Sequence, residues 1–342
     1  MPNIKRGMMA AAGGGAAPCE DCGLFALGTN TDGQLGLGNT TAYSSPVQTY
    51  AAVPTSYSTG NAFSGLVKTD GTLWMTGRNN YGQLGLGTQG WGTEVSSWTQ
   101  VGTHTTWDQV SCGDGFVIAR KTDGTIWTWG DDFAGALGNG TLGGDVSSPV
   151  QVGSLTDWTT VLANGNSVAA YKDDALWCWG KGENGQMGDG VHVNYSSPVQ
   201  VASSGYANGI RSSTGQQRFL AHHPKTNNTI VAAGYGYKGA LGLGATNSTN
   251  VFTQIGSTDW TWVTFGNYNI FARRTNGDLY AWGYSPGSWY ANGDGTTGTD
   301  RSSPVQIGSG ETWGADFRHG SGSAYGGMAI NTSGELFGWG YN

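Results

Sequence analysis

The sequence predicts an all-β protein in which one unit of four short strands is repeated radially, as in a β-propeller. A short phrase, best preserved as Ile-Trp-Thr-Trp-Gly at 126–130, occurs seven times in the 342 residues. The closing glycines are 49 to 57 residues apart, a spacing that indicates a repeat architecture. No segment of helical length shows the 3.6-residue apolar period of an amphipathic helix. The closing glycines are Gly28, Gly77, Gly130, Gly180, Gly234, Gly283 and Gly340.

The first two strands of each unit are predicted from apolar patterns that come before the phrase. The first has the pattern Trp-x-x-Val, which is clearest at 107–110, 158–161 and 260–263. The second is a short apolar run, as at 116–119 and 168–171. Runs of this length between turn residues are typical of buried strands.

A tight turn is predicted between the second strand and the phrase, which forms the third strand. Asp-Gly and Asn-Gly accept the positive φ angles of a type I′ turn, whose twist matches that of a hairpin. We therefore expect type I′ hairpins here. The turn dipeptides are Asp70-Gly71, Asp123-Gly124, Asn276-Gly277 and Ser333-Gly334.

A glycine-rich loop and a Ser-Pro-Val-Gln strand complete the unit. The loop reads Gly-Gln-Leu-Gly-Leu-Gly at 33–38 and has four further copies. These loops recur in successive repeats and no helical pattern follows them, so we interpret them as structural turns rather than phosphate loops. A proline early in the fourth strand suits an outer, edge position. The fourth-strand copies are 45–48, 148–151, 197–200 and 303–306.

Together these elements resemble the regulator-of-chromosome-condensation (RCC1) repeat family. The resemblance covers residues 24–342 and implies a seven-bladed β-propeller. We assign residues 23–342 to the propeller and residues 1–22 to a Gly/Ala-rich N-terminal arm. The seventh blade requires the N-terminus, where residues 7–11 could supply a strand. The alternative is a six-bladed ring closed by the N-terminal strand at 45–48, which would complete the last blade.

Composition and charge limit the partners. The chain has 16 Lys and Arg against 23 Asp and Glu, a net charge of −7, and no basic stripe. Nucleic-acid binding depends on cationic contacts to phosphate, so we expect no nucleic-acid partner. No run of 18 apolar residues occurs, so we expect no membrane span.

The four cysteines indicate no metal or redox centre. Cys19 and Cys22 form a single CxxC without the further ligands that zinc needs, and whether they are bonded to each other stays open. Cys112 and Cys178 fall at strand positions and are expected in the core.

Candidate binding residues are the tryptophans outside the recurrent positions. These are Trp91, Trp98 and Trp289, of which Trp91 lies in a lengthened loop and Trp289, beside Tyr290, lies in a degenerate one. Aromatic side chains on loops can stack on sugars or pack against a protein partner. The competing interpretation is local packing within the loops.

We expect no enzyme activity, no metal and no cofactor. The acidic loop at 292–300 lacks the spacing and the closing Glu of an EF-hand, and Asp131-Asp132 is no more specific. None of the five histidines is paired with a Cys or Ser in a catalytic arrangement, and no hydrolase or P-loop motif occurs.

The founding member of the resembled family is a nucleotide-exchange factor for a small GTPase and docks on chromatin. Its basic surfaces and basic arm have no counterpart here, so no functional residue is carried over. In composition and regularity the chain looks like RCC1-repeat proteins encoded by marine bacteriophages.

We therefore expect a non-enzymatic virion surface or appendage protein, in contact with a host surface or glycan. It would be tethered to other virion or self subunits through its arm, with Lys5, Arg6, Met8 and Met9 as tether residues. The alternative is a soluble cytoplasmic scaffold that binds a protein partner.

Overall fold

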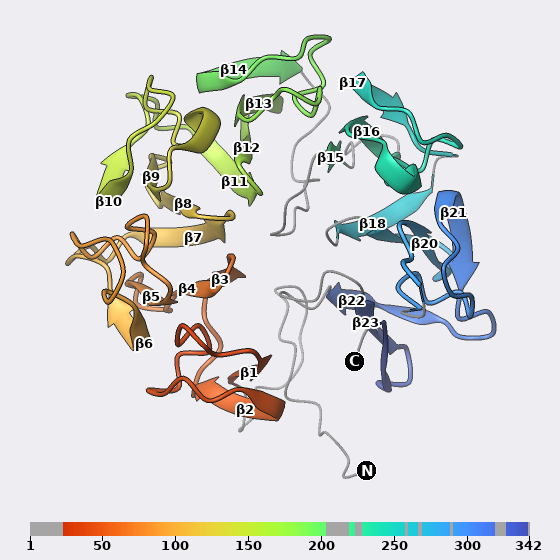
Figure 1. The fold of residues 1–342 in the computed structure, drawn as a ribbon, viewed down its shortest axis with the longest axis horizontal. Helices are drawn as coiled ribbons and strands as arrows, with labels where there is room; N and C mark the ends of the chain where they lie inside the picture. Colours follow the sequence, from red (N-terminus) through yellow and green to blue (C-terminus); the bar gives the residue numbers. More distant parts are fainter. Residues whose placement is uncertain are drawn as a thin grey trace.

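The structure, a computed structural model, describes residues 23–202, 219–222, 228–256, 259–265, 269–287, 290–318 and 326–340. In this part of the chain the strands form separate antiparallel sheets, which are arranged as a ring (Figure 1). The expected all-β propeller architecture is confirmed.

Four sheets have four strands, and in each sheet every strand pairs with its neighbour in the sequence. The first sheet comprises β3 (Ser56–Thr59), β4 (Phe63–Val67), β5 (Leu73–Gly77) and β6 (Val95–Gln100). The second comprises β7 (Trp107–Cys112), β8 (Phe116–Lys121), β9 (Ile126–Gly130) and β10 (Val146–Gln151). The third comprises β11 (Trp158–Asn164), β12 (Ser167–Lys172), β13 (Ala175–Gly180) and β14 (Tyr195–Ala202). The fourth comprises β18 (Trp260–Phe265), β19 (Asn269–Arg274), β20 (Leu279–Gly283) and β21 (Arg301–Ile307).

Three further sheets have fewer strands within the described residues. One pairs β1 (Leu24–Gly28) with β2 (Tyr43–Tyr50). Another comprises β15 (Phe219–His222), β16 (Val231–Gly234) and β17 (Thr249–Gln254). The last comprises β22 (Trp313–Arg318), β23 (Gly326–Asn331) and β24 (Leu336–Gly340).

The expected number of blades is therefore corrected. Neither seven complete four-stranded blades nor six are formed by the described residues, in which four sheets are complete. The six-bladed alternative fails for a specific reason. Residues 45–48 lie in β2, which pairs with β1 of its own repeat through Phe25↔Gln48 and Ala26↔Val47, not with the last sheet. The strand suggested at 7–11 lies outside the described residues.

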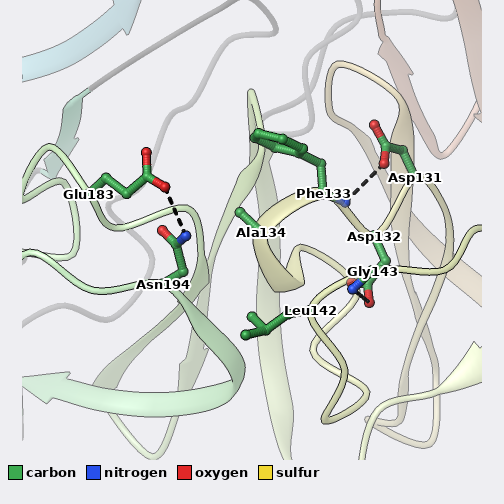
Figure 2. Close-up of a pocket in the computed structure, with 8 residues that line it drawn as sticks. All are labelled: Asp131, Asp132, Phe133, Ala134, Leu142, Gly143, Glu183 and Asn194. Atoms are coloured by element: carbon green, nitrogen blue, oxygen red, sulfur yellow. Dashed lines mark hydrogen bonds between the residues drawn. The ribbon is translucent and has the colours of Figure 1, made fainter.

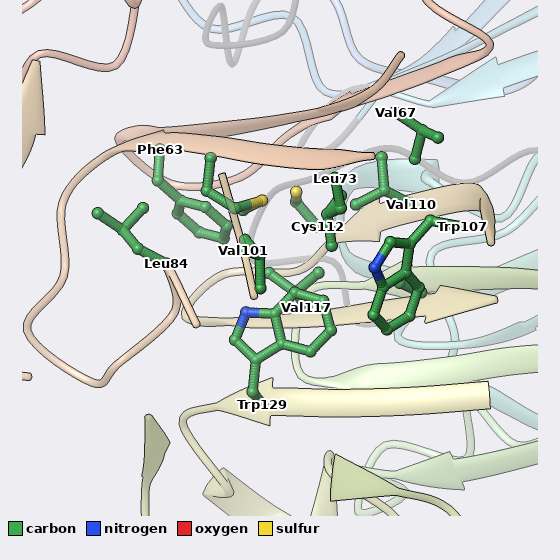
Figure 3. Packing of buried hydrophobic residues seen from close by; sticks show 12 residues of the cluster. Phe63, Val67, Leu73, Leu84, Val101, Trp107, Val110, Cys112, Val117 and Trp129 are labelled. Atoms are coloured by element: carbon green, nitrogen blue, oxygen red, sulfur yellow. The ribbon is translucent and has the colours of Figure 1, made fainter. Parts of the chain in front are cut away.

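The third-strand phrase packs its two sides against two neighbouring sheets. Trp127 and Trp129 of β9 face the β3–β6 sheet, where Trp129 contacts a cluster that includes Leu84 and Trp107 (Figure 3). Ile126 faces the opposite way and joins the cluster shared with the β11–β14 sheet. Alternation along a strand thus gives each sheet two buried faces. The core of the molecule consequently lies between sheets.

The hairpin turns differ from the expected type I′. Gly71 donates its N–H to the carbonyl of Lys68 at 3.0 Å, and φ is +76° at Gly71 while Asp70 has an ordinary negative φ. This is a type I turn followed by a glycine bulge, and the three other predicted turns share its bond pattern. A type I′ turn does occur at Asp173-Asp174, where both φ angles are positive, at 50° and 65°.

Each glycine-rich loop packs on the next sheet around the ring. The Gly87 N–H donates to the Ser147 carbonyl at 2.8 Å, and the Trp129 indole donates to the Gln83 carbonyl at 2.9 Å. A Cβ on Gly85, where φ is +68°, would lie 2.8 Å from that indole nitrogen. The loops are structural, as predicted, because they link one blade to the next.

Candidate interaction face

All glycine-rich loops emerge at the same end of the ring. Third strands run in the same direction in every sheet, so their ends share one face. At this end the Asp131 N–H donates to the Gly115 carbonyl and the Arg78 N–H donates to the Ala62 carbonyl, which places the loops beside the turns between first and second strands. We name this end the loop face; its loops are 29–42, 78–94, 131–145, 181–194, 235–248 and 284–300. The opposite end, with the hairpin turns, is the turn face.

Exposed apolar side chains concentrate on the loop face. Of the fourteen large apolar side chains that are exposed in the described part of the chain, eight lie in these loops. Scattered single exposed apolar residues are normal on a protein surface, whereas a concentration on one side indicates an interaction surface. The eight are Tyr81, Trp91, Phe133, Leu142, Val191, Val193, Tyr237 and Tyr290.

Trp91 is the most exposed of these side chains, with 84% of its surface accessible. It is presented by a braced turn: the Gly90 N–H donates to the carbonyl of Asn79 at 3.1 Å. The Asn79 side chain, which is buried, donates to the Thr93 hydroxyl at 3.0 Å. That hydroxyl donates in turn to the Gly90 carbonyl at 2.7 Å. A large aromatic group is thus held in solvent on a pre-formed loop.

The other predicted binding residues lie in different places. Tyr290 is 50% exposed and lies on the loop face, but in the loop after β20, so it is separated from Trp91 by several sheets (Figure 1). Trp289 and the tether residues Lys5, Arg6, Met8 and Met9 lie outside the described residues, as do Cys19 and Cys22. The structure therefore does not bring Trp91 and Tyr290 together.

Trp98 has a packing position instead. It lies on β6, half-buried, and a Cβ on Gly36 would be 2.5 Å from its indole nitrogen. In the next two sheets the corresponding glycine meets the Trp that closes the phrase, Trp129 or Trp179. In the β3–β6 sheet, Thr76 stands before the closing glycine, where the next sheets have Trp. Trp98 from the adjacent strand fills the space that this Trp would occupy. Trp98 thus has a packing role in the structure.

Neighbouring loops of the loop face contact one another, and we call each such contact a seam. The residue types in the seams differ from blade to blade. Between the first two loops, Arg78 Nε lies 2.9 Å from Asp32 Oδ1. Burial alone would raise the pKa of Asp32, but hydrogen bonds from Arg78 and Thr31 hold it below the usual value. This seam is therefore closed by a partly buried ion pair.

The two aromatic seams are the ones that sequence reasoning missed. Lys181 Nζ lies 5.2 Å from the centre of the Phe133 ring. Tyr237 stacks on Tyr235 at 5.7 Å and contacts Tyr284 at 6.1 Å. Phe133 and Tyr237 are each the third residue after a closing glycine and each begins a 3-10 turn, η1 (Phe133–Gly135) and η2 (Tyr237–Gly239). Aligning the loops on the closing glycine would have found them.

A shallow pocket opens beside Phe133, between loops 131–145 and 181–194. Its volume is 370 Å³. Figure 2 shows Glu183 and Asn194 on one side, Asp131 on the other, and Phe133 and Leu142 between them. The pocket thus combines exposed apolar groups with carboxylates.

The carboxylates near this pocket have different roles. Asp132 is buried and structural: it accepts hydrogen bonds from the Leu137 N–H at 3.0 Å and the Gly143 N–H at 3.0 Å. Burial raises the pKa of Asp114 to about 6, and the charge of Asp131 adds to the rise. Burial also raises the pKa of Asp131, and Asp145 adds to it. Burial likewise raises the pKa of Asp145, and the charge of Asp132 adds to it, so neighbouring carboxylates in this group disfavour each other's ionisation.

The acidic loop at 292–300 is committed to structural bonds. Asp294 accepts from Thr296 and lies 2.7 Å from Arg301 Nε; burial opposes ionisation of its carboxyl, but these bonds hold its pKa below the usual value. Asp300 accepts from the Ser285 N–H and pairs with Lys238 at 3.2 Å. Within the described residues, no three His, Cys, Asp or Glu side chains are grouped so as to hold a metal ion.

The internal cysteines are core residues, as predicted. Cys112 and Cys178 are both fully buried thiols. Burial raises the pKa of Cys112 to about 12 and raises that of Cys178 further, so neither is a reactive thiolate. In the parts of the chain that the structure covers, no helix is long and apolar enough to cross a membrane.

The repeats match a known family model. The model of the regulator of chromosome condensation (RCC1) repeat matches residues 70–120, 123–170 and 173–217, and a second RCC1-repeat model matches residues 107–136. The fold defines a β-propeller, and these matches show that its blades include RCC1 repeats.

Curated relatives share part of this region. The human X-linked retinitis pigmentosa GTPase regulator is 35% identical over 122 residues, which are 34% of this chain and 12% of that protein. The zebrafish protein RCC2 homolog is 32% identical over 101 residues, 27% of this chain and 18% of the relative. The human probable E3 ubiquitin-protein ligase HERC6 is 32% identical over 125 residues, 12% of its length. The chain thus spans less than a fifth of each of these relatives.

Solved structures confirm the fold over most of the chain. Human WBSCR16 superposes with a TM-score of 0.75 at 18% identity, covering 92% of this chain and 88% of that one. Yeast RCC1 (Prp20), in its structure bound to Kap60, gives a TM-score of 0.73 at 15% identity, covering 98% and 86%. None of these matched proteins is viral, so the expected virion role, with its virion or self subunits as partners, finds no support in them.

Proposed function

We propose that this protein is a non-enzymatic scaffold that binds a partner protein through its loop face, with Trp91 as an anchor. The observation that carries the proposal is the braced, 84% exposed Trp91 among the exposed apolar side chains of one face. Exposed aromatic residues on pre-formed loops contribute strongly to protein interfaces because little conformational entropy is lost on binding.

The relatives support a protein partner rather than a glycan or a virion. Yeast RCC1 (Prp20) has been solved bound to Kap60, and another Prp20p structure was described with its binding properties to Gsp1p and histones. Those partners belong to those proteins; what we transfer is only the use of an RCC1-type propeller to bind protein. Under this proposal the protein works in the cell, as the cytoplasmic alternative expects.

Site-specific photo-crosslinking tests the proposal. A photoreactive phenylalanine analogue replaces Trp91 in the full chain, and a control places it at Val150, which is 44% exposed on the outer strand β10. In extract of the source cells, we expect one dominant protein adduct at position 91 and none at position 150. The same adducts at both positions, or none at 91, would contradict the proposal.

A substitution of Trp91 measures how much this side chain contributes to partner binding. Trp91→Ala should weaken capture of the crosslinked partner about tenfold or more, since loss of an anchoring Trp commonly costs about 2 kcal/mol or more. The melting temperature should not change, because an exposed side chain contributes little to folding. Undiminished capture by the variant would exclude Trp91 as the anchor.

A further inference from the structure

We infer that the pocket between loops 131–145 and 181–194 binds a basic segment of the partner protein. A Lys or Arg side chain of that segment lies beside Asp131, Asp114 and Asp145, and an adjacent apolar side chain packs on Phe133 and Leu142. This inference rests on the proposed function and names the class of partner that the loop face accepts.

The apolar half of the site is already in place. Phe133 is 50% exposed and Leu142 is 64% exposed, and both line the 370 Å³ pocket (Figure 2). The Asp131 carboxylate accepts the Phe133 N–H at 2.9 Å, which fixes the start of the η1 turn that carries the ring. Burying these two side chains against a partner removes apolar surface from water.

The charge of the site is uncompensated. Asp114, Asp131 and Asp145 have no cation within ion-pair distance among the described residues. Lys181 is the cation at this seam, and it pairs with Glu183 at 3.5 Å on the other side of the Phe133 ring. Asp131 lines the pocket, Asp145 is exposed and Asp114 is partly buried, and none of the three has a positive partner within the described residues.

Other seams of the same face are neutralised internally. Asp32 pairs with Arg78, and Asp300 pairs with Lys238. In loop 131–145 the residue equivalent to Arg78, the first after the closing glycine, is Asp131, so the position that supplies a cation in loop 78–94 supplies an anion here; in loop 181–194 this position is Lys181.

A cationic partner side chain would supply the missing charge and offset the burial and the mutual repulsion that raise the pKa of Asp114 and Asp131. An acidic segment would meet the same repulsion that these carboxyls exert on one another. Charge complementarity therefore selects a basic segment, and the apolar pocket beside it selects a segment that also carries an apolar residue.

Peptide display on the full-length protein tests this. A random 12-residue peptide library is selected on the wild-type protein, and the enriched peptides are synthesised with a fluorophore. Their dissociation constants are measured by anisotropy for the wild type and for Asp131→Asn/Asp145→Asn. The amide introduced by Asp131→Asn keeps an oxygen that accepts the Phe133 N–H, so the loop is preserved. The matched control is Asp174→Asn/Asp278→Asn, which removes two carboxylates from the turn face.

We expect enriched peptides to carry at least two Lys or Arg residues next to an apolar residue. Their dissociation constants should rise about tenfold in Asp131→Asn/Asp145→Asn and in Phe133→Ala, and stay unchanged in the control. Raising the salt concentration from about 20 to about 300 mM, which shortens the Debye length, should weaken binding as well.

Three outcomes would overturn the inference: no enriched peptide, enriched peptides without basic residues, or equal affinity for the wild type and the pocket variants. None of these decides the proposed function, which depends on the partner captured at Trp91. Conversely, a failed crosslink at position 91 combined with pocket-dependent basic peptides would reject Trp91 and retain the pocket.

Discussion

At the scale of single residues, the aromatic side chain that packs beneath a glycine-rich loop can come from either the third or the fourth strand of a sheet. Three phrases have no aromatic residue before the closing glycine, at Leu27, Thr76 and Ala233. In the sheets of the last two, the fourth strand carries Trp98 and Phe252 where others have proline. A Cβ on Gly188 would lie 2.4 Å from the Phe252 ring, as one on Gly36 would meet Trp98. In each sheet that follows a described glycine-rich loop, one aromatic group fills the space beneath that loop, because protein interiors are close-packed.

Moving the aromatic group back to the third strand tests this equivalence. Trp98→Ala should lower the free energy of unfolding by about 2–4 kcal/mol, since it leaves a cavity. Thr76→Trp alone should also destabilise, because two indoles then compete for one space. The double variant Thr76→Trp/Trp98→Pro reproduces the arrangement of Trp129 and Pro149 and should recover most of the loss. Additive destabilisation in denaturant titrations of the variants would refute the exchange.

Asp114 gives a pH-dependent effect on stability. Its pKa in the folded protein is raised to about 6, above the value of about 4 in an unfolded chain. As the pH rises, the unfolded chain loses this proton first, so ionisation favours unfolding. The contribution of Asp114 to the free energy of unfolding is therefore largest below pH 4, falls between pH 4 and 6, and is constant above.

Asp114→Asn should therefore be more stable than the wild type at pH 7.5, by about 1–2 kcal/mol after allowance for solvent screening of this partly exposed group. The difference should nearly vanish at pH 4. Urea titrations at both pH values measure it, and an equal difference at both would show that the carboxyl charge is not its cause.

At the scale of elements, the hairpin turn is shaped by the neighbouring sheet as well as by its own residues. Gly124 has a φ of +77°, and a Cβ there would lie 2.0 Å from the Thr156 carbonyl oxygen. The Trp158 N–H, at the start of the next sheet, donates to the Gly124 carbonyl at 3.2 Å. The glycine is therefore required both by its backbone conformation and by the closeness of the next blade.

Gly124→Ala should separate these two requirements when compared with Gly102→Ala. Gly102 also has a positive φ, of +58°, but open space where a Cβ would be. We expect Gly102→Ala to cost about 1 kcal/mol for the left-handed conformation alone. Gly124→Ala should cost about 2–4 kcal/mol, because the blades must also move apart. Equal losses in thermal or denaturant unfolding would show that the inter-blade contact contributes nothing.

At the scale of the whole molecule, the repeats form a uniform frame with a variable face. The frame consists of inter-blade bonds that recur at equivalent positions, such as the loop-to-strand bonds of Gly38, Gly87, Gly140, Gly190 and Gly244. The side chains of the first residues after the closing glycines take no part in these recurring bonds and differ between blades, as at Arg78, Asp131, Lys181 and Tyr235. A surface can therefore vary without disturbing the core, which is how both the proposed anchor Trp91 and the acidic pocket can coexist on one face.

Much of the frame was predictable because its signals are local. The seven phrases predicted the third strands, and the Trp-x-x-Val, apolar and Pro-Val patterns predicted the others. The site was less predictable. Trp91 is singled out as a candidate because it breaks the repeat, whereas Trp98 breaks the repeat for a packing reason that appears only when two strands lie side by side. The pocket lies between loops about 50 residues apart in the chain, so no local pattern indicates it.

The sequence by itself determined that the chain folds as a β-propeller of RCC1-like repeats, because alternation, turn residues and period are properties of consecutive residues. Only the tertiary structure decided which sheets are complete, that 45–48 pairs within its own repeat, and that the hairpins are bulged rather than type I′. It also decided which loop side chains meet. These outcomes depend on distances between blades, and a blade's neighbour is set by closure of the ring rather than by adjacency in the sequence.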